Sequence, residues 1–269
     1  MAASLLASGC RREPPRIEWT RSLAAARELA GAARKLIVVD LYTEWCAPCR
    51  KMDAETWPHP EVVAERDRYV FLKLEAEKDA DGIALKKRCG VEGYPTILIL
   101  DSDGNEFERL VGFSSGPDLV KKLRSAIADP DSLGNLRLRE NKAPRDLALR
   151  FKLAKSLFEH SALQEAQTRF ERIALDDPQN TSKVADLALF FLAWCQYDQN
   201  QADGALDTIA RLRKTLPHSA ILPDAMLLQS EILLRSGRRE RARAEINDFL
   251  KRYPKHRLVE QARKLLAEL

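Results

Sequence analysis

Two cysteines separated by two residues are the part of the sequence best suited to chemistry. Cys46 and Cys49 lie in the stretch YTEWCAPCR (42–50), directly after an apolar run. This spacing can hold half of a zinc site, close a structural disulfide or carry out thiol–disulfide exchange. A four-ligand zinc site needs a second close pair of ligands, and the other cysteines and the four histidines are scattered. The sequence therefore predicts no metal site.

The position of the pair between a strand and a helix favours redox chemistry over a structural disulfide. The apolar run LIVVDLYT (36–43) is typical of a strand buried on both faces, and CRKMDAETW (49–57) has helical character. Cys46 is then expected near a helix N-terminus, where unpaired N–H groups lower the pKa of a thiol. Cys49, one turn further, would be shielded until it resolves a mixed disulfide. Pro48 between them restrains the loop and stiffens the start of the helix.

These residues resemble the active-site segment of thioredoxins, and the resemblance covers roughly residues 18–128. Cys-Ala-Pro-Cys stands here in place of the commoner Cys-Gly-Pro-Cys of that family. The stretches EWTRSLAAARELA and KMDAETWPHPEVV look more narrowly like the C-terminal domain of the periplasmic thiol–disulfide interchange reductase and related proteins. The resemblance implies a protein-disulfide reductase that needs no cofactor and acts on disulfide-containing client proteins.

A buried acid and a lysine behind the cysteine pair follow from the same resemblance. Asp40 falls where the family keeps a buried carboxylate, and Lys73 matches the lysine near it. A buried carboxylate has a raised pKa and can take the proton from Cys49. The alternative, an exposed acid at a strand end, is disfavoured by the apolar neighbours of Asp40.

The substrate-binding residues are predicted to flank the cysteine pair. Pro95, in GVEGYPT (90–96), matches a cis-proline of the family that lies against the disulfide. Without an N–H at Pro95, neighbouring backbone would be free to pair with an extended substrate. Trp45, Pro48 and Tyr94 are expected to contact the substrate. An ordinary edge-strand proline and simple packing of Trp45 remain the alternatives.

The two remaining cysteines inside the predicted domains are interpreted as packing residues. Cys89 departs from the thioredoxin pattern, which usually has an aromatic residue there, and Cys195 lies in an apolar helical stretch. Cysteine without a partner is commonly a small buried apolar residue.

The first half of the chain predicts an α/β thioredoxin fold, a mixed sheet flanked by helices. Helix-like and strand-like runs alternate in the order α-β-α-β-α-β-β-α. The predicted helices are 22–35, the segment from Cys49 onward, 79–90 and 116–128, and the predicted strands are 36–43, 69–77, 95–101 and 107–113. The predicted domains are a signal remnant or tether at 1–17, the thioredoxin-like domain at 18–128, a linker at 129–145 and an all-α repeat domain at 146–269.

The second half carries a degenerate repeat of small residues and prolines. Small residues and a proline recur at spacings of twelve in three sets: Ala154, Ala166 and Pro178; Ala193, Ala205 and Pro217; Ser230, Ala242 and Pro254. The pattern resembles tetratricopeptide repeats, whose period is about 34 residues. It predicts helix pairs over 147–178, 186–217 and 223–254, with a capping helix at 255–269. Such repeats bind peptides or protein surfaces, and an unrelated helical bundle is the alternative.

The N-terminal stretch MAASLLASGC resembles the end of a bacterial lipoprotein signal, with Cys10 as the lipidated residue. The stretch lacks a preceding basic residue and its apolar run is short, so a frayed terminus with a chance cysteine is the alternative. The lipoprotein hypothesis predicts a periplasmic protein anchored through a lipid on Cys10, and the alternative is a cytoplasmic one.

Two classes of function are compatible with these features. The first is a thiol–disulfide oxidoreductase whose repeats dock partners and whose electrons come from a membrane or soluble thiol reductase. The second is a helical-repeat scaffold that uses the thioredoxin fold only as a binding module. The set Cys46, Cys49, Asp40 and Pro95 favours the enzyme, because a docking module does not need it. The 44 basic and 40 acidic residues are interspersed, so no nucleic-acid partner is predicted.

Overall fold

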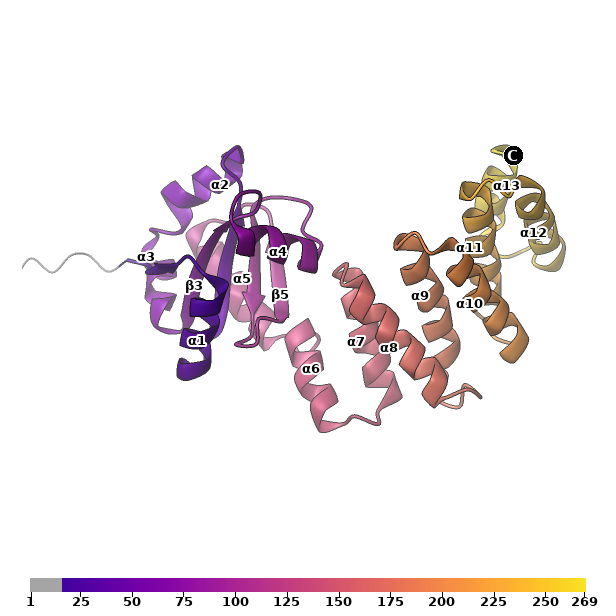
Figure 1. Ribbon diagram of the computed structural model, residues 1–269, viewed down its shortest axis with the longest axis horizontal. Coiled ribbons are helices and arrows are strands. Elements are labelled where there is room, and N and C mark those ends of the chain that lie inside the picture. Colours follow the sequence, from indigo (N-terminus) through magenta and orange to yellow (C-terminus); the bar gives the residue numbers. More distant parts are fainter. Residues whose placement is uncertain (1–15) are drawn as a thin grey trace, which may run out of the picture. The chain divides into compact units, whose positions relative to one another are not determined.

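The computed structural model describes residues 16–269, which divide into two compact units near Gly134 (Figure 1). The first unit contains the β-sheet, and the second is built from α-helices. Cys10 and the rest of the predicted signal remnant up to residue 15 lie outside the described residues.

The first unit is built on a mixed sheet of five strands. The strands are β1 (Trp19–Thr20), β2 (Leu36–Tyr42), β3 (Tyr69–Glu75), β4 (Thr96–Leu100) and β5 (Glu106–Val111). Their order is β1-β3-β2-β4-β5; β3 runs parallel to β1 and β2, and β4 runs antiparallel to β2 and β5. The predicted mixed sheet is therefore confirmed, with β2 at its centre. Because β2 is covered on both edges and both faces, its sequence is an almost unbroken apolar run.

One face of this sheet carries both the apolar core and the charged residues of the predicted site. Side chains alternate along a strand, so Asp40 shares a face with Val38, and Lys73 shares a face with Phe71. Val38 and Phe71 are buried in the main core of this unit, together with Met52, Trp57 and the residues of α5 that face the sheet. Asp40 and Lys73 are paired in register across β2 and β3. The charged pair is therefore a continuation of an apolar face.

The helices of the first unit begin at recognisable capping residues. They are α1 (Leu23–Ala33), α2 (Ala47–Lys51), α3 (Pro60–Ala64), α4 (Ala80–Cys89) and α5 (Gly116–Ala128). The Ser22 side chain accepts a hydrogen bond from the N–H of Ala25 at the start of α1, and Ser115 accepts one from Asp118 at the start of α5. Such caps satisfy N–H groups that have no partner inside the helix.

Two details of the first unit differ from the predicted elements. The helix expected from Cys49 onward is divided into α2, a π-helical segment Met52–Thr56 and the separate helix α3. The division arises because Pro60, which lacks an N–H, starts a new helix with His59 as its cap. Strand β1 was not predicted, since two residues are too few to show a periodicity.

The second unit consists of antiparallel helix pairs. It contains α6 (Leu133–Lys142), α7 (Leu147–Glu159), α8 (Leu163–Asp176), α9 (Ala185–Asp198), α10 (Ala202–Thr215), α11 (Leu222–Arg235), α12 (Arg239–Arg252) and α13 (Val259–Ala267). Helices α7 to α12 lie at the positions predicted for the three helix pairs to within two residues, and α13 lies within the range predicted for the capping helix. The small residues of the repeat, from Ala154 to Ala242, are all fully buried. Their size lets the paired helices approach closely, and each repeat proline follows the end of a second helix.

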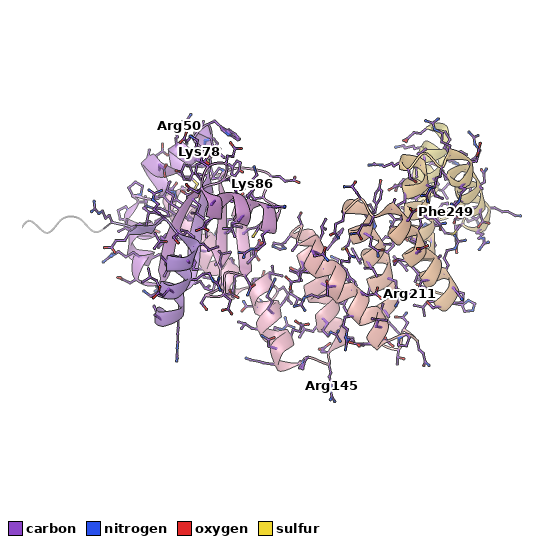
Figure 2. The ribbon with its side chains drawn as sticks, viewed as in Figure 1. Arg50, Lys78, Lys86, Arg145, Arg211 and Phe249 are labelled. Atoms are coloured by element: carbon purple, nitrogen blue, oxygen red, sulfur yellow. A yellow bond between two sulfur atoms is a disulfide. The ribbon has the colours of Figure 1, made fainter. Side chains whose placement is uncertain are left out.

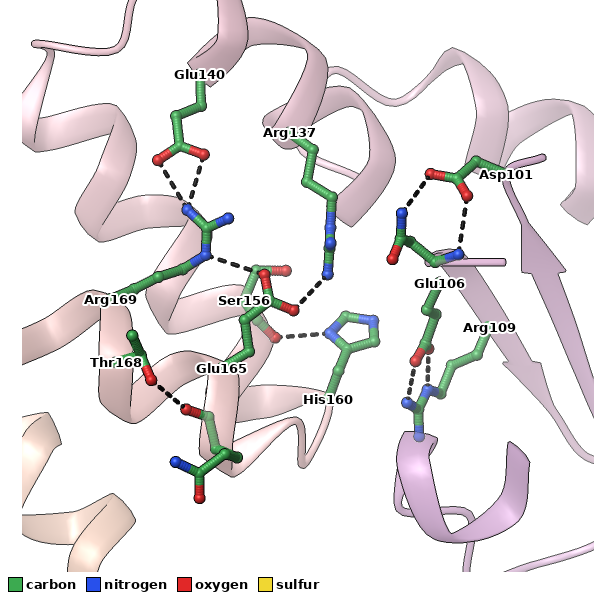
Figure 3. Close-up of polar contacts among 12 residues, drawn as sticks. Asp101, Glu106, Arg109, Arg137, Glu140, Ser156, His160, Glu165, Thr168 and Arg169 are labelled. Carbon is green, nitrogen blue, oxygen red and sulfur yellow. Dashed lines mark hydrogen bonds and ion pairs between the residues drawn. The ribbon is translucent and has the colours of Figure 1, made fainter. Parts of the chain in front are cut away.

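Helix α6 lies within the segment that was predicted to be a linker. Arg137 of α6 contacts Glu165 of α8 at 2.9 Å, and Glu140 contacts Arg169 at 2.8 Å (Figure 3). Arg169 also contacts Glu165 at 3.0 Å, which joins the four side chains into one network. The turn formers that suggested a linker flank this helix on both sides, and the ion pairs hold it against α8.

None of the helices formed by residues 16–269 is long and apolar enough to cross a membrane.

Candidate active site

Cys46 and Cys49 form a disulfide at the start of α2, with an S–S distance of 2.06 Å. Cys46 is the N-cap residue, and its sulfur accepts a hydrogen bond from the backbone N–H of Cys49 at 3.1 Å. Pro48 lies in the first turn of α2, as predicted. Both cysteines are almost fully buried. When the pair is reduced, the same N–H group would favour a thiolate at Cys46, because hydrogen bonding to the charged form stabilises it.

Asp40 is a buried carboxylate at the centre of the sheet. It is 1% exposed, and its Oδ2 accepts a hydrogen bond from Lys73 Nζ at 2.6 Å. Its Oδ1 is buried without a hydrogen bond inside residues 16–269. Burial raises the pKa of Asp40 above its ordinary value, and the Lys73 ammonium opposes this shift without cancelling it. Asp40 can therefore hold a proton under conditions in which an exposed aspartate cannot.

Lys73 lies between two carboxylates, one of which the sequence did not single out. Its Nζ contacts Asp40 Oδ2 and also Asp53 Oδ1, from the π-helical segment. The rings of Tyr42 and Trp19 lie 4.7 and 5.4 Å from the same nitrogen. Burial acts to lower the pKa of Lys73, but its two ion pairs outweigh burial, so this pKa is raised. Lys73 is therefore a largely buried charged group held between two carboxylates and two aromatic rings.

Trp45 is the main exposed aromatic residue next to the disulfide. Its side chain is 65% exposed, and its indole N–H donates to Glu77 Oε2 at 3.0 Å. The ring of Tyr94 packs edge-on against Trp45, with centroids 5.8 Å apart, and Lys86 lies over the Tyr94 ring. Trp45 is therefore held in place while most of its surface stays accessible. Glu77, which the sequence analysis missed, supplies the hydrogen bond.

Charged side chains surround this aromatic pair at the end of the unit that holds α2. Arg50 donates a hydrogen bond to the backbone carbonyl of Glu44, whose carboxylate contacts Lys78. Figure 2 labels Arg50, Lys78 and Lys86 in this region. The surface next to the disulfide thus combines exposed aromatic area with charges of both signs.

The peptide bond between Tyr94 and Pro95 is cis. Pro95 is buried, and its carbonyl accepts a hydrogen bond from the N–H of Gly112 at 2.9 Å. Thr96 Oγ1 donates to the carbonyl of Gly93 at 2.7 Å, which closes the turn before β4. The loop next to Trp45 is therefore held by hydrogen bonds at Gly93 and Pro95, on either side of Tyr94.

The other two described cysteines, Cys89 and Cys195, are buried and form no disulfide. Cys89 is 3% exposed and Cys195 is fully buried, and burial raises the pKa of Cys195 to about 12. A thiol with such a pKa is protonated and inert at neutral pH. In residues 16–269, no group of three or more histidine, cysteine or acidic side chains is arranged to hold a metal ion.

Replacing Asp40 by asparagine is expected to stabilise the oxidised protein at neutral and higher pH. The raised pKa of Asp40 means that folding disfavours its charged form, so its contribution to stability is lost as pH rises. At pH 8 the variant should be the more stable of the two, because asparagine has no charge that burial disfavours. Below the unfolded-state pKa of 3.8 the difference should vanish. Urea unfolding at several pH values measures this, and an equally stable variant at pH 8 would contradict it.

Family models match both halves of the chain. Residues 18–102 match the thioredoxin-like family, and residues 187–219 and 224–256 match the tetratricopeptide repeat. The chain thus combines a thioredoxin-like domain with tetratricopeptide repeats, and the resemblance stated from the sequence is confirmed for both.

The relatives of the first half include thiol:disulfide interchange proteins. The chain is 36% identical over 104 residues to "Thiol:disulfide interchange protein DsbD" of Cronobacter sakazakii, covering 38% of this chain and 18% of the relative. It is 30% identical over 116 residues to the protein of that name in Pseudoalteromonas atlantica, covering 41% and 20%. The chain therefore spans about a fifth of the length of these relatives.

Solved structures of similar domains cover the same half. The DsbD C-terminal domain of Neisseria meningitidis in the oxidised form is 26% identical, with 40% of this chain and 99% of that chain covered and a TM-score of 0.36. A putative disulphide-isomerase from Bacteroides thetaiotaomicron is 32% identical, with 44% and 98% covered and a TM-score of 0.39.

Proposed function

We propose that the protein is a thiol–disulfide oxidoreductase that reduces or exchanges disulfides in client proteins through Cys46 and Cys49. The observation that carries this proposal is the Cys46–Cys49 disulfide at the start of α2, in a unit that also buries Asp40 and Lys73 within its core. A purely structural disulfide needs neither a buried acid nor an exposed aromatic surface beside it. The direct test is reduction of insulin disulfides by the reduced protein, with Cys46→Ala as the control.

The reaction proceeds in two exchange steps. The Cys46 thiolate attacks one sulfur of a client disulfide, so that a mixed disulfide forms and the other client sulfur leaves as a thiolate. Cys49 then loses its proton to Asp40, and the resulting thiolate attacks the Cys46 sulfur. The Cys46–Cys49 disulfide forms, and the second client sulfur leaves. The client gains two electrons, which the protein supplies.

Substrate docking is assigned to the surface around the cysteine pair. Trp45 and Tyr94 offer aromatic area, and Pro48 lies between the two cysteines. The backbone beside Pro95, which itself lacks an N–H, is assigned to pair with an extended client segment by β-augmentation. Recognition through the client backbone suits an enzyme that acts on several clients, since backbone groups are the same in all sequences.

The composition of the motif favours a reductase over an oxidase. Residues 47 and 48, between the cysteines, are Ala-Pro, without the histidine of strong oxidants of this family. The dithiol–disulfide couple of Cys46 and Cys49 is therefore assigned a reduction potential near the thioredoxin value of about −270 mV. Such a protein must receive electrons after each turnover, and we assign this role to a membrane or soluble thiol reductase.

The tetratricopeptide repeats are assigned to partner docking. Within the second unit, residues of α9, α11 and the C-terminal segment line a hollow of about 140 Å³. Its lining includes Phe190, Trp194, Leu227 and Glu231. Trp194 and Tyr197 are half-buried, with ring centroids 6.3 Å apart. A hollow with aromatic, aliphatic and acidic side chains suits a peptide or protein segment.

The location of the protein is proposed to be periplasmic, with an anchor through Cys10. If Cys10 carries a lipid, the native full-length protein should fractionate with membranes and show a lipid-sized increase in mass. Changing Cys10 to serine should move it entirely to the soluble fraction, because the acyl chains that bind the bilayer are lost. Unmodified protein in the soluble fraction of its native host would contradict the anchor and would leave the redox function untouched.

A further inference from the structure

The hollow in the second unit is built from one face of each of three helices. It has a volume of about 140 Å³ and lies on α9 and α11, the first helices of the last two repeat pairs, and on the capping helix α13. Helix α11 contacts both of the others (Figure 1). The lining residues recur at spacings of three and four, which place them on the same side of a helix. They are Phe190 and Trp194 from α9, Asp224, Leu227, Leu228 and Glu231 from α11, and Leu258 and Gln261 from the start of α13.

The floor of this hollow is apolar and its size suits one side chain. Leu227 and Leu228 are 3% and 2% exposed, and Trp194 beside them is half-buried. Sites that enclose a whole small molecule usually have volumes of roughly 300–1,000 Å³. The hollow is smaller than that, so it can hold a single side chain of a bound segment.

The two acids that line the hollow differ in their partners. Asp224 forms an ion pair with Arg257. Glu231 Oε1 accepts a hydrogen bond from the neutral amide of Gln261 at 2.9 Å. Within the described part of the chain, Glu231 forms no ion pair with a lysine or an arginine, and Arg235, one turn further along α11, is exposed. The hollow therefore carries one negative charge that no cation of the repeats neutralises.

We propose that this hollow binds a lysine or arginine side chain of a partner segment. The inference rests on the docking role proposed for the repeats and deepens it by naming the group that is recognised. The alkyl stem of such a side chain packs on Leu227 and Leu228, and its charged end meets Trp194 and Glu231. An aromatic ring attracts a cation through its quadrupole, and a carboxylate accepts a charge-assisted hydrogen bond from it.

A neutral apolar side chain is the alternative occupant, since it would also fill an apolar floor. An acidic side chain is disfavoured, because the Glu231 carboxylate repels it. The cationic and the neutral occupant differ in their response to the charge of Glu231. Removing this charge weakens the binding of a cation and leaves the binding of a neutral side chain in place.

The test uses the full-length protein and four alanine pentapeptides with blocked ends. Their central residue is lysine, arginine, glutamate or norleucine, which keeps the stem of lysine and lacks its charge. Binding is followed through the indole N–H signals in NMR spectra, and the signal of Trp194 is identified by its loss in Trp194→Phe. Glu231→Gln removes the charge and keeps the shape of the side chain. Glu240→Gln is the matched control, because Glu240 is exposed on α12 and does not line the hollow.

We expect the lysine and arginine peptides to shift the Trp194 signal saturably at up to about 10 mM, with dissociation constants of about 1 mM. The norleucine peptide should bind about three- to tenfold more weakly. Glu231→Gln should weaken the two cationic peptides by a similar factor of about three to ten, and Glu240→Gln by less than about twofold. Glu231→Lys should reverse the preference, so that the glutamate peptide binds in place of the lysine peptide.

The possible failures separate the inference from the proposed function. Equal binding of the norleucine and lysine peptides, or an equal loss in Glu231→Gln and Glu240→Gln, would overturn the cationic ligand and leave the docking role of the repeats standing. If none of the four peptides shifts the Trp194 signal, the hollow is not a docking site, and the inference fails together with that part of the proposed function. The redox part is decided separately by insulin reduction, which involves none of these peptides.

Discussion

Replacing Cys49 with alanine is expected to leave Cys46 joined to its clients through mixed disulfides. The first exchange step needs only Cys46, whereas release of the client needs the Cys49 sulfur, which is bonded to Cys46 in the oxidised protein. A well-placed intramolecular group has an effective concentration of about 10⁵ M or more, which external thiols at millimolar levels cannot replace. We therefore expect release to slow by more than about a thousandfold. Non-reducing gels of native extracts, followed by mass spectrometry, measure the trapped clients.

The controls for this experiment separate the enzyme from the scaffold. The adducts should disappear on reduction and should be absent when Cys46 is also replaced by alanine. Adding Trp194→Ala to the Cys49→Ala chain should change which clients are trapped if the repeats select them. If Cys49→Ala traps nothing and the repeats still bind a partner, the protein is a scaffold and its cysteine pair has another role.

Replacing Asp40 with asparagine is expected to slow disulfide exchange by about a hundredfold near neutral pH, the usual contribution of a general base. Asparagine keeps the shape of the side chain and removes the group that takes the proton from Cys49. The loss should shrink toward pH 9, where hydroxide and solvent deprotonate more of the thiol directly. Insulin reduction from pH 6 to 9 measures the effect, with Glu55→Gln as the control. Equal rates across this range would mean that Asp40 has only a structural role.

The fold could be predicted from the sequence wherever one local pattern determines an element. The unbroken apolar run of β2 indicated a central strand, because a strand covered on both faces has no polar side to alternate. The small residues and prolines of the repeats marked the helix pairs, since close packing and helix ends each need a particular residue type. Strand β1 and helix α6 were missed because tertiary contacts maintain them. Two residues pair with β3, and four charged side chains hold α6 against α8.

The residues of the candidate site also fall into two groups, those that could be identified from the sequence and those that only the folded structure reveals. The sequence singled out Cys46 and Cys49 by their spacing between a strand and a helix, and it singled out Asp40 and Lys73 through the resemblance to thioredoxins. It did not single out Asp53 or Glu77, although they contact Lys73 and Trp45. Asp53 lies in the helical stretch after the cysteine pair and Glu77 in the turn after β3. Acidic residues at such positions are normally solvated, so nothing in the local pattern distinguished these two. Their roles depend on which side chain the fold brings opposite them.

The most direct test of the central claim is the reduction of insulin disulfides by the full-length protein. The oxidised protein is reduced with dithiothreitol, freed of it and mixed with insulin, and the thiols of each partner are counted by alkylation and mass spectrometry. The account predicts that insulin gains two thiols for each Cys46–Cys49 disulfide that forms, and that Cys46→Ala transfers none. A protein that stays reduced in the presence of insulin, or a Cys46→Ala variant that transfers electrons as fast as the unchanged chain, would contradict it.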